Sequence, residues 1–178
     1  MKSLEMYQET LLAHNEQPHH FYALPHPSHQ AQGKNPLCGD EITVYMQIEN
    51  DILRIISFTG QGCAICKASA SLMTARLEGK TIVQAKEEAE RILAWLTDAF
   101  FPCPKDLGEL EALQGVRNFP MRLKCATLAW HTFQKACDTP VSSVCACQKN
   151  SSHSCGCSKH VHPNGSGSSH SGKGCCRS

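Results

Sequence analysis

The segment from residue 42 to residue 58 constrains the fold of this chain more than any other. Between Ile42 and Ile48, apolar side chains occupy every second position, which is the period of a strand with one buried face. The dipeptide Asn50-Asp51 is a turn signal, and the run ILRIISF that follows it predicts a returning strand. The sequence therefore predicts an antiparallel β-hairpin.

Helical patterns flank this hairpin on both sides. We expect helices over residues 4–14, 67–78, 82–100, 107–113 and 121–136. Gly79 marks the end of the second helix, Thr81 and Gln84 form a capping box for the third, and Phe101-Pro102 ends it. Residues 17–36 are rich in proline and histidine and are interpreted as a loop. The predicted fold class is α+β, a small antiparallel β-sheet with helices packed against it.

The C-terminal part of the chain has a different composition. From Val141 onward there is no aspartate or glutamate, and serine, glycine, histidine and cysteine dominate. Such a segment has too little apolar area to offset the entropy of folding. We therefore divide the chain into a domain over residues 1–139 and a disordered C-terminal tail over residues 140–178.

Six of the 12 cysteines lie in this tail. Its cysteines and histidines are spaced like ligands of soft metals, and these are Cys145, Cys147, His153, Cys155, Cys157, His160, His162, Cys175 and Cys176. Metal binding by the tail is one interpretation, and a polar tail without a metal is the other.

The cellular compartment decides how the cysteines are interpreted. The N-terminus has no signal-peptide pattern, and no apolar stretch is long enough to span a membrane. A reducing, cytoplasmic location is expected, where cysteines indicate metal or sulfur chemistry more than disulfides. The net charge of +1 favours neither the presence nor the absence of a nucleic-acid partner. Neither nucleic acids nor membranes are among the partners that we expect.

Three cysteines of the domain lie at structural junctions. Cys38 precedes a predicted strand, Cys63 lies between a strand and a helix, and Cys125 lies near the start of the last helix. A thiol at a helix N-terminus is shifted toward the thiolate, which is the form that binds metals. Together with Asp40 these residues could supply a tetrahedral zinc site of three thiolates and one carboxylate. The alternative is that they are ordinary buried thiols.

Longer motifs around these cysteines resemble a known family. The stretches NPLCGDEI, FTGQGCAICKASASLMT and DLGELEALQGVRNFPMRLKCATLAW occur in this order, and together they resemble the iron-sulfur cluster assembly family of IscU, NifU and SufU. The resemblance covers residues 4–137. The SufU branch fits best, because of the segment DLGELEALQGVRNFP and because Lys124 stands where the IscU branch has histidine.

The resemblance implies a function and a set of site residues. It implies that Cys38, Asp40, Cys63 and Cys125 bind zinc, and that the chain accepts persulfide sulfur from a pyridoxal-phosphate cysteine desulfurase of the SufS type. Downstream iron-sulfur assembly proteins would then receive the sulfur. We favour Cys38 as the acceptor, because the adjacent glycine, Gly39, frees its loop to move.

The formal charge of such a site, about −2, calls for basic neighbours. Lys67, Arg122 and Lys124 are the candidates, and solvated surface charges are the alternative for Lys67 and Arg122.

Two other functions remain open at this stage. In one, the same ligands hold an iron-sulfur cluster on a scaffold protein, which Lys124 disfavours because lysine stays protonated near neutral pH. In the other, the protein stores metal through its tail. Cys66 also has two interpretations, as a buried thiol or as an alternative ligand and sulfur relay. Whether the protein is an enzyme in its own right is left open.

Overall fold

A computed structural model describes residues 4–141 of the chain. The elements follow in the order α1 (Leu4–Glu16), β1 (His29–Asn35), β2 (Asp40–Glu49), β3 (Ile52–Gln61), α2 (Ala64–Leu77), α3 (Ile82–Thr97), the 3-10 helix η1 (Gly108–Asn118) and α4 (Pro120–Cys137). The strands form one antiparallel sheet in the order β1-β2-β3. The predicted α+β class is confirmed. Among the described residues, no helix is long and apolar enough to cross a membrane.

The β2–β3 hairpin has the register that the alternating pattern predicts. Val44 stands opposite Phe58, and Met46 stands opposite Ile56. The four side chains are at most 1% exposed, so they form the core face of the sheet. Both turn residues between the strands, Asn50 and Asp51, have positive φ, as a tight two-residue hairpin turn requires.

The prediction of a loop over residues 17–36 is wrong in its second half. Residues 29–35 form β1, which pairs antiparallel with β2 and places Ala31 opposite Val44. Ala31 and Asn35 are the buried residues of this strand. The sequence HQAQGKN carries one apolar side chain, so its pairing depends on backbone hydrogen bonds to β2 rather than on an apolar pattern.

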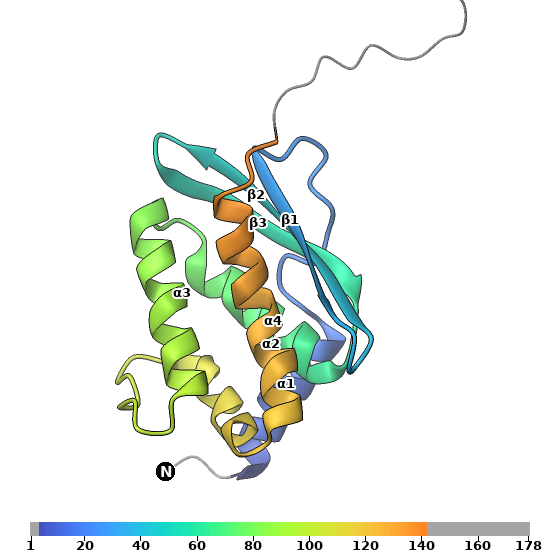
Figure 1. Cartoon of the computed structure of the whole chain (residues 1–178), viewed down its shortest axis with the longest axis vertical. Coiled ribbons are helices and arrows are strands. Elements are labelled where there is room, and N and C mark those ends of the chain that lie inside the picture. The colour runs from blue at the N-terminus through green and yellow to red at the C-terminus, as the bar shows by residue number, and fades with distance from the viewer. Residues whose placement is uncertain (1–3, 142–178) are drawn as a thin grey trace, which may run out of the picture. The chain divides into compact units, whose positions relative to one another are not determined.

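The helices pack against the core face of the sheet. Helix α4 contacts β1 and β2, whereas α2 and α3 contact β3 (Figure 1). The largest side chains of the core are fully buried, among them Trp95, Trp130, Phe58 and Phe133. The capping box of α3 is confirmed, since the Thr81 hydroxyl accepts from the Gln84 amide and the Gln84 side chain accepts from the Thr81 amide.

Helix α3 ends earlier than predicted. Its last residue is Thr97, and the Asp98 carboxylate accepts a hydrogen bond of 2.9 Å from the Phe100 backbone amide. This local bond turns the chain away from the helix, and Phe100 is 96% exposed. The predicted Phe101-Pro102 signal therefore lies beyond the true end of the helix.

A buried hydroxyl joins α2, which Cys63 precedes, to α4, which contains Cys125. Ser69 of α2 donates a 2.6 Å hydrogen bond to the backbone oxygen of Ala126 in α4, and its oxygen accepts from the indole nitrogen of Trp130 at 3.1 Å. Because Ala126 directly follows Cys125, these contacts fix α2 against α4 close to the candidate ligands.

The described part of the chain continues beyond α4 along the sheet. Pro140 forms an isolated bridge with His29, and the Val141 amide donates to the backbone oxygen of Ser28 at 2.8 Å. Residues 142–178 lie outside the described part of the chain. The predicted disorder of the tail and its proposed metal ligands, from Cys145 to Cys176, therefore remain predictions.

Candidate metal centre

The turn between β1 and β2 carries Cys38 at one end of the sheet. Asn35 and Asp40 are cross-strand partners, and the four residues between them form the turn. The Cys38 amide donates to the backbone oxygen of Asn35 at 3.3 Å. Gly39 has φ +69°, a conformation that favours glycine. The Cys38 side chain is exposed, so a partner protein could reach its sulfur.

The loop between β3 and α2 brings Cys63 onto the Asp40 carboxylate. The Cys63 amide donates to Asp40 Oδ1 at 2.7 Å, and the Cys63 sulfur lies 3.8 Å from Asp40 Oδ2. This approach requires glycine at position 62, because a Cβ there would lie 2.8 Å from Asp40 Oδ1. Cys63 also caps α2, since its sulfur accepts from the Cys66 amide at 3.5 Å. The positive end of the helix dipole therefore faces this thiol.

Helix α4 supplies Cys125 from its second turn. The side chain is 2% exposed, and its sulfur lies 3.2 Å from the sulfur of Cys38. The amide nitrogen of Asn35 donates to the same Cys125 sulfur at 3.5 Å. In Figure 1 the β1–β2 turn, the start of α2 and the first turns of α4 lie at the same end of the sheet.

The structure brings the sequence-predicted residues together, three of them most tightly. Cys38, Asp40 and Cys125 each offer a ligand atom within 4.8 Å of the other two. Cys63 joins this group through its 3.8 Å contact with Asp40. Two ligand atoms on one tetrahedral zinc, each about 2.0–2.3 Å from the metal, are about 3.3–3.8 Å apart. The 3.2 Å between the sulfurs of Cys38 and Cys125 and the 3.8 Å between Cys63 and Asp40 are close to that range, whereas Cys63 does not lie within 4.8 Å of all three other ligands.

The electrostatics of the group also suit a cation. Burial raises the pKa of the Cys125 thiol, and hydrogen bonds with Asp40, Cys38 and Cys63 raise it further. Asp40 is 1% exposed, and among residues 4–141 no lysine, arginine or histidine forms an ion pair with it. A buried carboxylate beside buried thiols is costly unless a positive charge compensates it. A bound divalent metal would supply that charge and deprotonate the thiols.

The three basic residues that were predicted as neighbours of the group have different surroundings. The Lys67 ammonium lies 5.6 Å from the centre of the Phe21 ring, and the Arg122 guanidinium lies 5.1 Å from that of Phe119. Lys124 is exposed beside Cys125. Two of the three predicted neighbours therefore make cation–π contacts.

Three further cysteines lie in the described part of the chain, and the backbone amide of one of them, Cys66, contacts the Cys63 sulfur. Cys66 is fully buried in the core, and burial, followed by the charges of Asp40, Cys63 and Cys38, raises its pKa to about 12. This favours the buried-thiol interpretation. Cys103 is exposed, and Cys137 is half-buried with a pKa raised to about 11 by burial.

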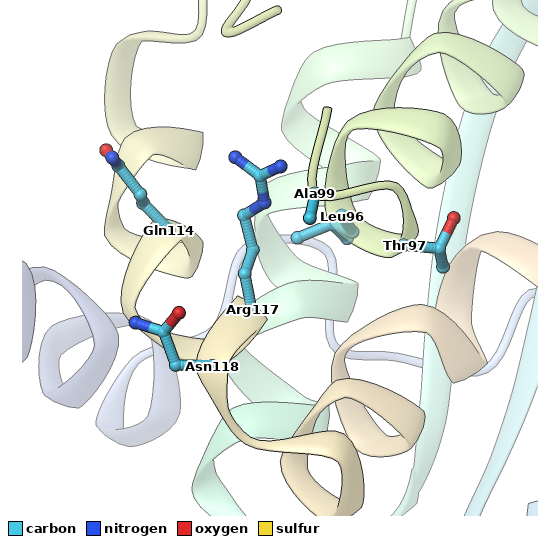
Figure 2. A pocket seen from close by; sticks show the side chains of 6 residues that line it. All are labelled: Leu96, Thr97, Ala99, Gln114, Arg117 and Asn118. Atoms are coloured by element: carbon cyan, nitrogen blue, oxygen red, sulfur yellow. The ribbon is translucent and has the colours of Figure 1, made fainter. Parts of the chain in front are cut away.

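A hollow elsewhere on the domain lacks the chemistry of a metal site. It lies between the end of α3 and η1 and is lined by Leu96, Thr97, Ala99, Gln114, Arg117 and Asn118 (Figure 2). Arg117 is its charged residue, and this side chain donates to the Asp98 backbone oxygen at 2.7 Å and lies 5.7 Å from the Trp95 ring. The Arg117 guanidinium thus contacts the end of α3 through Asp98 and Trp95.

Two residues of the centre were not predicted from the sequence as part of it. Asn35 was assigned only to the predicted loop over residues 17–36 and to the motif NPLCGDEI, yet its amide contacts Cys125, 90 positions away. Gly62 appeared only inside the motif FTGQGCAICKASASLMT, but its specific role is to let the loop pass over Asp40. The motif NPLCGD around Cys38 was the available signal for Asn35.

Comparison with known proteins agrees with this geometry. The family model of the NifU-like N terminal domain matches residues 6–136. The zinc-dependent sulfurtransferase SufU of Bacillus subtilis (strain 168) is 37% identical over 130 residues, covering 73% of this chain and 88% of that protein. The iron-sulfur cluster assembly scaffold protein IscU of Streptococcus pyogenes serotype M1 is also 37% identical, over 131 residues that cover 74% of this chain and 82% of its own.

A solved structure supports the same relationship. The crystal structure of a candidate iron-sulfur cluster assembly scaffold protein for the SUF system, from Fervidobacterium islandicum AW-1, has a TM-score of 0.67 and 28% sequence identity. The match covers 76% of this chain and 98% of that chain. The chain belongs to the NifU-like N-terminal domain family, the SufU/IscU/NifU family of iron-sulfur cluster assembly proteins.

Proposed function

We propose that this protein is a zinc-dependent sulfur acceptor that takes persulfide sulfur from a cysteine desulfurase of the SufS type for iron-sulfur cluster assembly. The observation that carries the proposal is the convergence of Cys38, Asp40 and Cys125, with Cys63 beside them. The 37% sequence identity to SufU of Bacillus subtilis, a zinc-dependent sulfurtransferase, supports zinc as the metal. Three thiolates and one carboxylate suit zinc and permit ligand exchange better than four thiolates would.

The ligands differ in their access to a partner. Cys38 is exposed on a turn, whereas Cys125 is buried in α4 and Cys63 is held by the cap of α2. Asp40 is anchored by the amide of Cys63. We therefore assign the acceptor role to Cys38 and the anchoring role to the other three.

The transfer step conserves atoms and electrons. The Cys38 thiolate attacks the outer sulfur of the desulfurase persulfide, so a sulfur–sulfur bond forms on Cys38. The sulfur–sulfur bond to the desulfurase cysteine breaks, and that cysteine leaves as a thiolate. The chain then carries a persulfide on Cys38, and no external oxidant or reductant is consumed. Zinc, when bound, keeps the site thiols deprotonated near neutral pH.

The experiment combines metal analysis with a desulfurase assay. Protein purified without added metal is analysed for zinc, and its effect on the turnover of a SufS-type desulfurase with cysteine is measured. One zinc per chain together with increased turnover supports the proposal. A protein that carries no zinc, or zinc-loaded protein that leaves turnover unchanged, contradicts it.

A scaffold for an iron-sulfur cluster is the second candidate function. The 37% sequence identity to the IscU scaffold protein of Streptococcus pyogenes favours this function. The candidate ligands would be the same four residues as for zinc. Lys124, which is exposed next to Cys125, is a poor cluster ligand because an ammonium group has no lone pair to offer to iron. A visible iron-sulfur chromophore in the purified protein would favour the scaffold, whereas colourless zinc protein favours sulfur transfer.

A further inference from the structure

Asn35 is a buried amide placed between the two cysteines that lie closest together. It is the last residue of β1, it is 6% exposed and it stands opposite Asp40. Its backbone oxygen accepts from the Cys38 amide at 3.3 Å, and its side-chain oxygen accepts from the Leu37 amide at 3.3 Å. These two bonds shape the turn that presents Cys38.

The bond from Leu37 determines which end of the Asn35 amide faces the sulfur. A backbone N–H group can only donate, so its partner is the amide oxygen. The amide nitrogen therefore points the other way, where it lies 3.5 Å from the sulfur of Cys125. A metal-bound thiolate has no proton to donate, so this contact is a hydrogen bond from Asn35 to Cys125.

We propose that Asn35 is a positioning residue that makes Cys125 the fixed thiolate of the centre and leaves Cys38 as the thiolate that exchanges. A hydrogen bond to a metal-bound sulfur withdraws charge from it and lowers its reactivity. Cys38 receives no such bond from Asn35, whose side chain donates to Cys125. The amide is neutral, so it leaves the charge of the ligand set unchanged. This inference rests on the proposed sulfur-acceptor function.

Two substitutions separate the hydrogen bond from the turn. Asn35→Asp keeps the shape and the acceptor for Leu37, but directs an oxygen instead of an N–H group at the Cys125 sulfur. Asn35→Ser keeps a short acceptor for the turn and cannot reach the sulfur. Gln32→Ser is the matched control, because Gln32 is an exposed amide of the same strand.

The first measurement is the zinc affinity of the full-length protein, determined by competition with a chelator. Outer-shell partners of metal ligands contribute about 10-fold to 100-fold to affinity. We expect a loss of about 10-fold for Asn35→Ser, a larger loss for Asn35→Asp, and no change for Gln32→Ser. An unchanged affinity in both Asn35 variants would overturn the inference.

The second measurement is the order in which iodoacetamide alkylates the cysteines of the zinc-loaded protein, followed by peptide mass spectrometry. In the wild type, Cys38 should react before Cys125. In Asn35→Ser the reaction of Cys125 relative to Cys38 should rise about 10-fold. A purely structural role would instead expose the buried Cys66 as fast as Cys125, and that result, or an unchanged ratio, would overturn the inference.

The alkylation order of the wild type tests the inference by itself, so the test remains available if a variant fails to fold. Preferential alkylation of Cys125 over Cys38 in the wild type would contradict the proposed division of roles. Failure of the proposed function is visible separately: zinc-loaded wild type would then leave desulfurase turnover unchanged, while the effect of Asn35 on zinc affinity would persist.

Discussion

The sulfur atoms of Cys38 and Cys125 lie 3.2 Å apart, although 87 positions separate the two residues in the sequence. The turn that follows β1 carries the first, and the second turn of α4 carries the second. Both belong to the candidate ligand group but differ in exposure, since Cys38 is exposed and Cys125 is 2% exposed. In the proposed function, this difference separates the exchanging ligand from the anchoring one.

Replacing Cys66 by alanine tests whether a second thiol relays sulfur. Cys66 is fully buried in the core, so we expect Cys66→Ala to bind zinc and stimulate the desulfurase like the wild type. The lost sulfur should lower the free energy of unfolding by about 1 kcal/mol. Cys103→Ala, which removes an exposed thiol, is the control for both assays. Loss of stimulation with zinc retained would identify Cys66 as a relay.

A methyl group at position 62 should disturb the Asp40 carboxylate. The Cβ of Gly62→Ala would lie 2.8 Å from Asp40 Oδ1, so the loop or the carboxylate must shift. We expect zinc affinity to fall about 10-fold, measured by chelator competition. The control is Gly115→Ala, whose Cβ would meet nothing within 4 Å. Equal affinities of the two variants would show that the position of Asp40 does not limit binding.

Removing the Ser69 hydroxyl should loosen the contact between α2 and α4. Ser69→Ala leaves the indole N–H of Trp130 buried without its partner, which costs about 1–3 kcal/mol in the free energy of unfolding. Thr97→Ala is the control, because its exposed hydroxyl bonds within its own helix and its loss should cost under about 0.5 kcal/mol. Urea unfolding measures both. A similar cost for the two would contradict a special role for Ser69.

His14 should make the stability of the domain depend on pH. Burial lowers the pKa of His14 from 6.5, with Glu109 acting in the opposite direction and His19 adding to the decrease. The unfolded chain therefore takes up the proton first as the pH falls. The contribution of neutral His14 is complete above about pH 6.5 and is lost as the pH falls toward the folded-state pKa.

Urea unfolding at about pH 7.5 and about pH 5.5 measures this effect. The free energy of unfolding should fall more on acidification in the wild type than in His14→Asn, which retains a partner for the Ser71 hydroxyl that bonds His14 Nδ1 at 2.8 Å. The exposed residue His131 supplies the control His131→Asn, which should behave like the wild type. An equal fall in His14→Asn would rule out His14 as the source.

Local patterns predicted most of the fold. The alternation from Ile42 to Ile48 predicted β2, and the capping box of Thr81 and Gln84 predicted the start of α3. Strand β1 was missed because its side chains carry almost no apolar pattern, and its order comes from backbone pairing with β2. The pattern of apolar residues also did not show that residues 108–118 form a 3-10 helix rather than an α-helix.

The candidate site was also predicted only in part, because local patterns do not record contacts between distant elements. Cys38, Asp40, Cys63 and Cys125 were selected from junctions and family-like motifs, and the structure brings them near one another. Asn35 could not be selected as a sulfur contact, because its partner lies in α4 and no local pattern records that packing. Contacts between distant elements depend on the packed fold, not on neighbouring residues.

The location of transferred sulfur tests the proposed function most directly. The zinc-loaded full-length protein is incubated with a SufS-type desulfurase and cysteine, its thiols are blocked, and its peptides are mapped by mass spectrometry. We expect the peptide of Cys38 to gain the mass of one sulfur atom, and Cys38→Ala to gain none while keeping its fold. A zinc-loaded wild type that gains no sulfur on Cys38, or gains it only on another cysteine, would contradict the proposal.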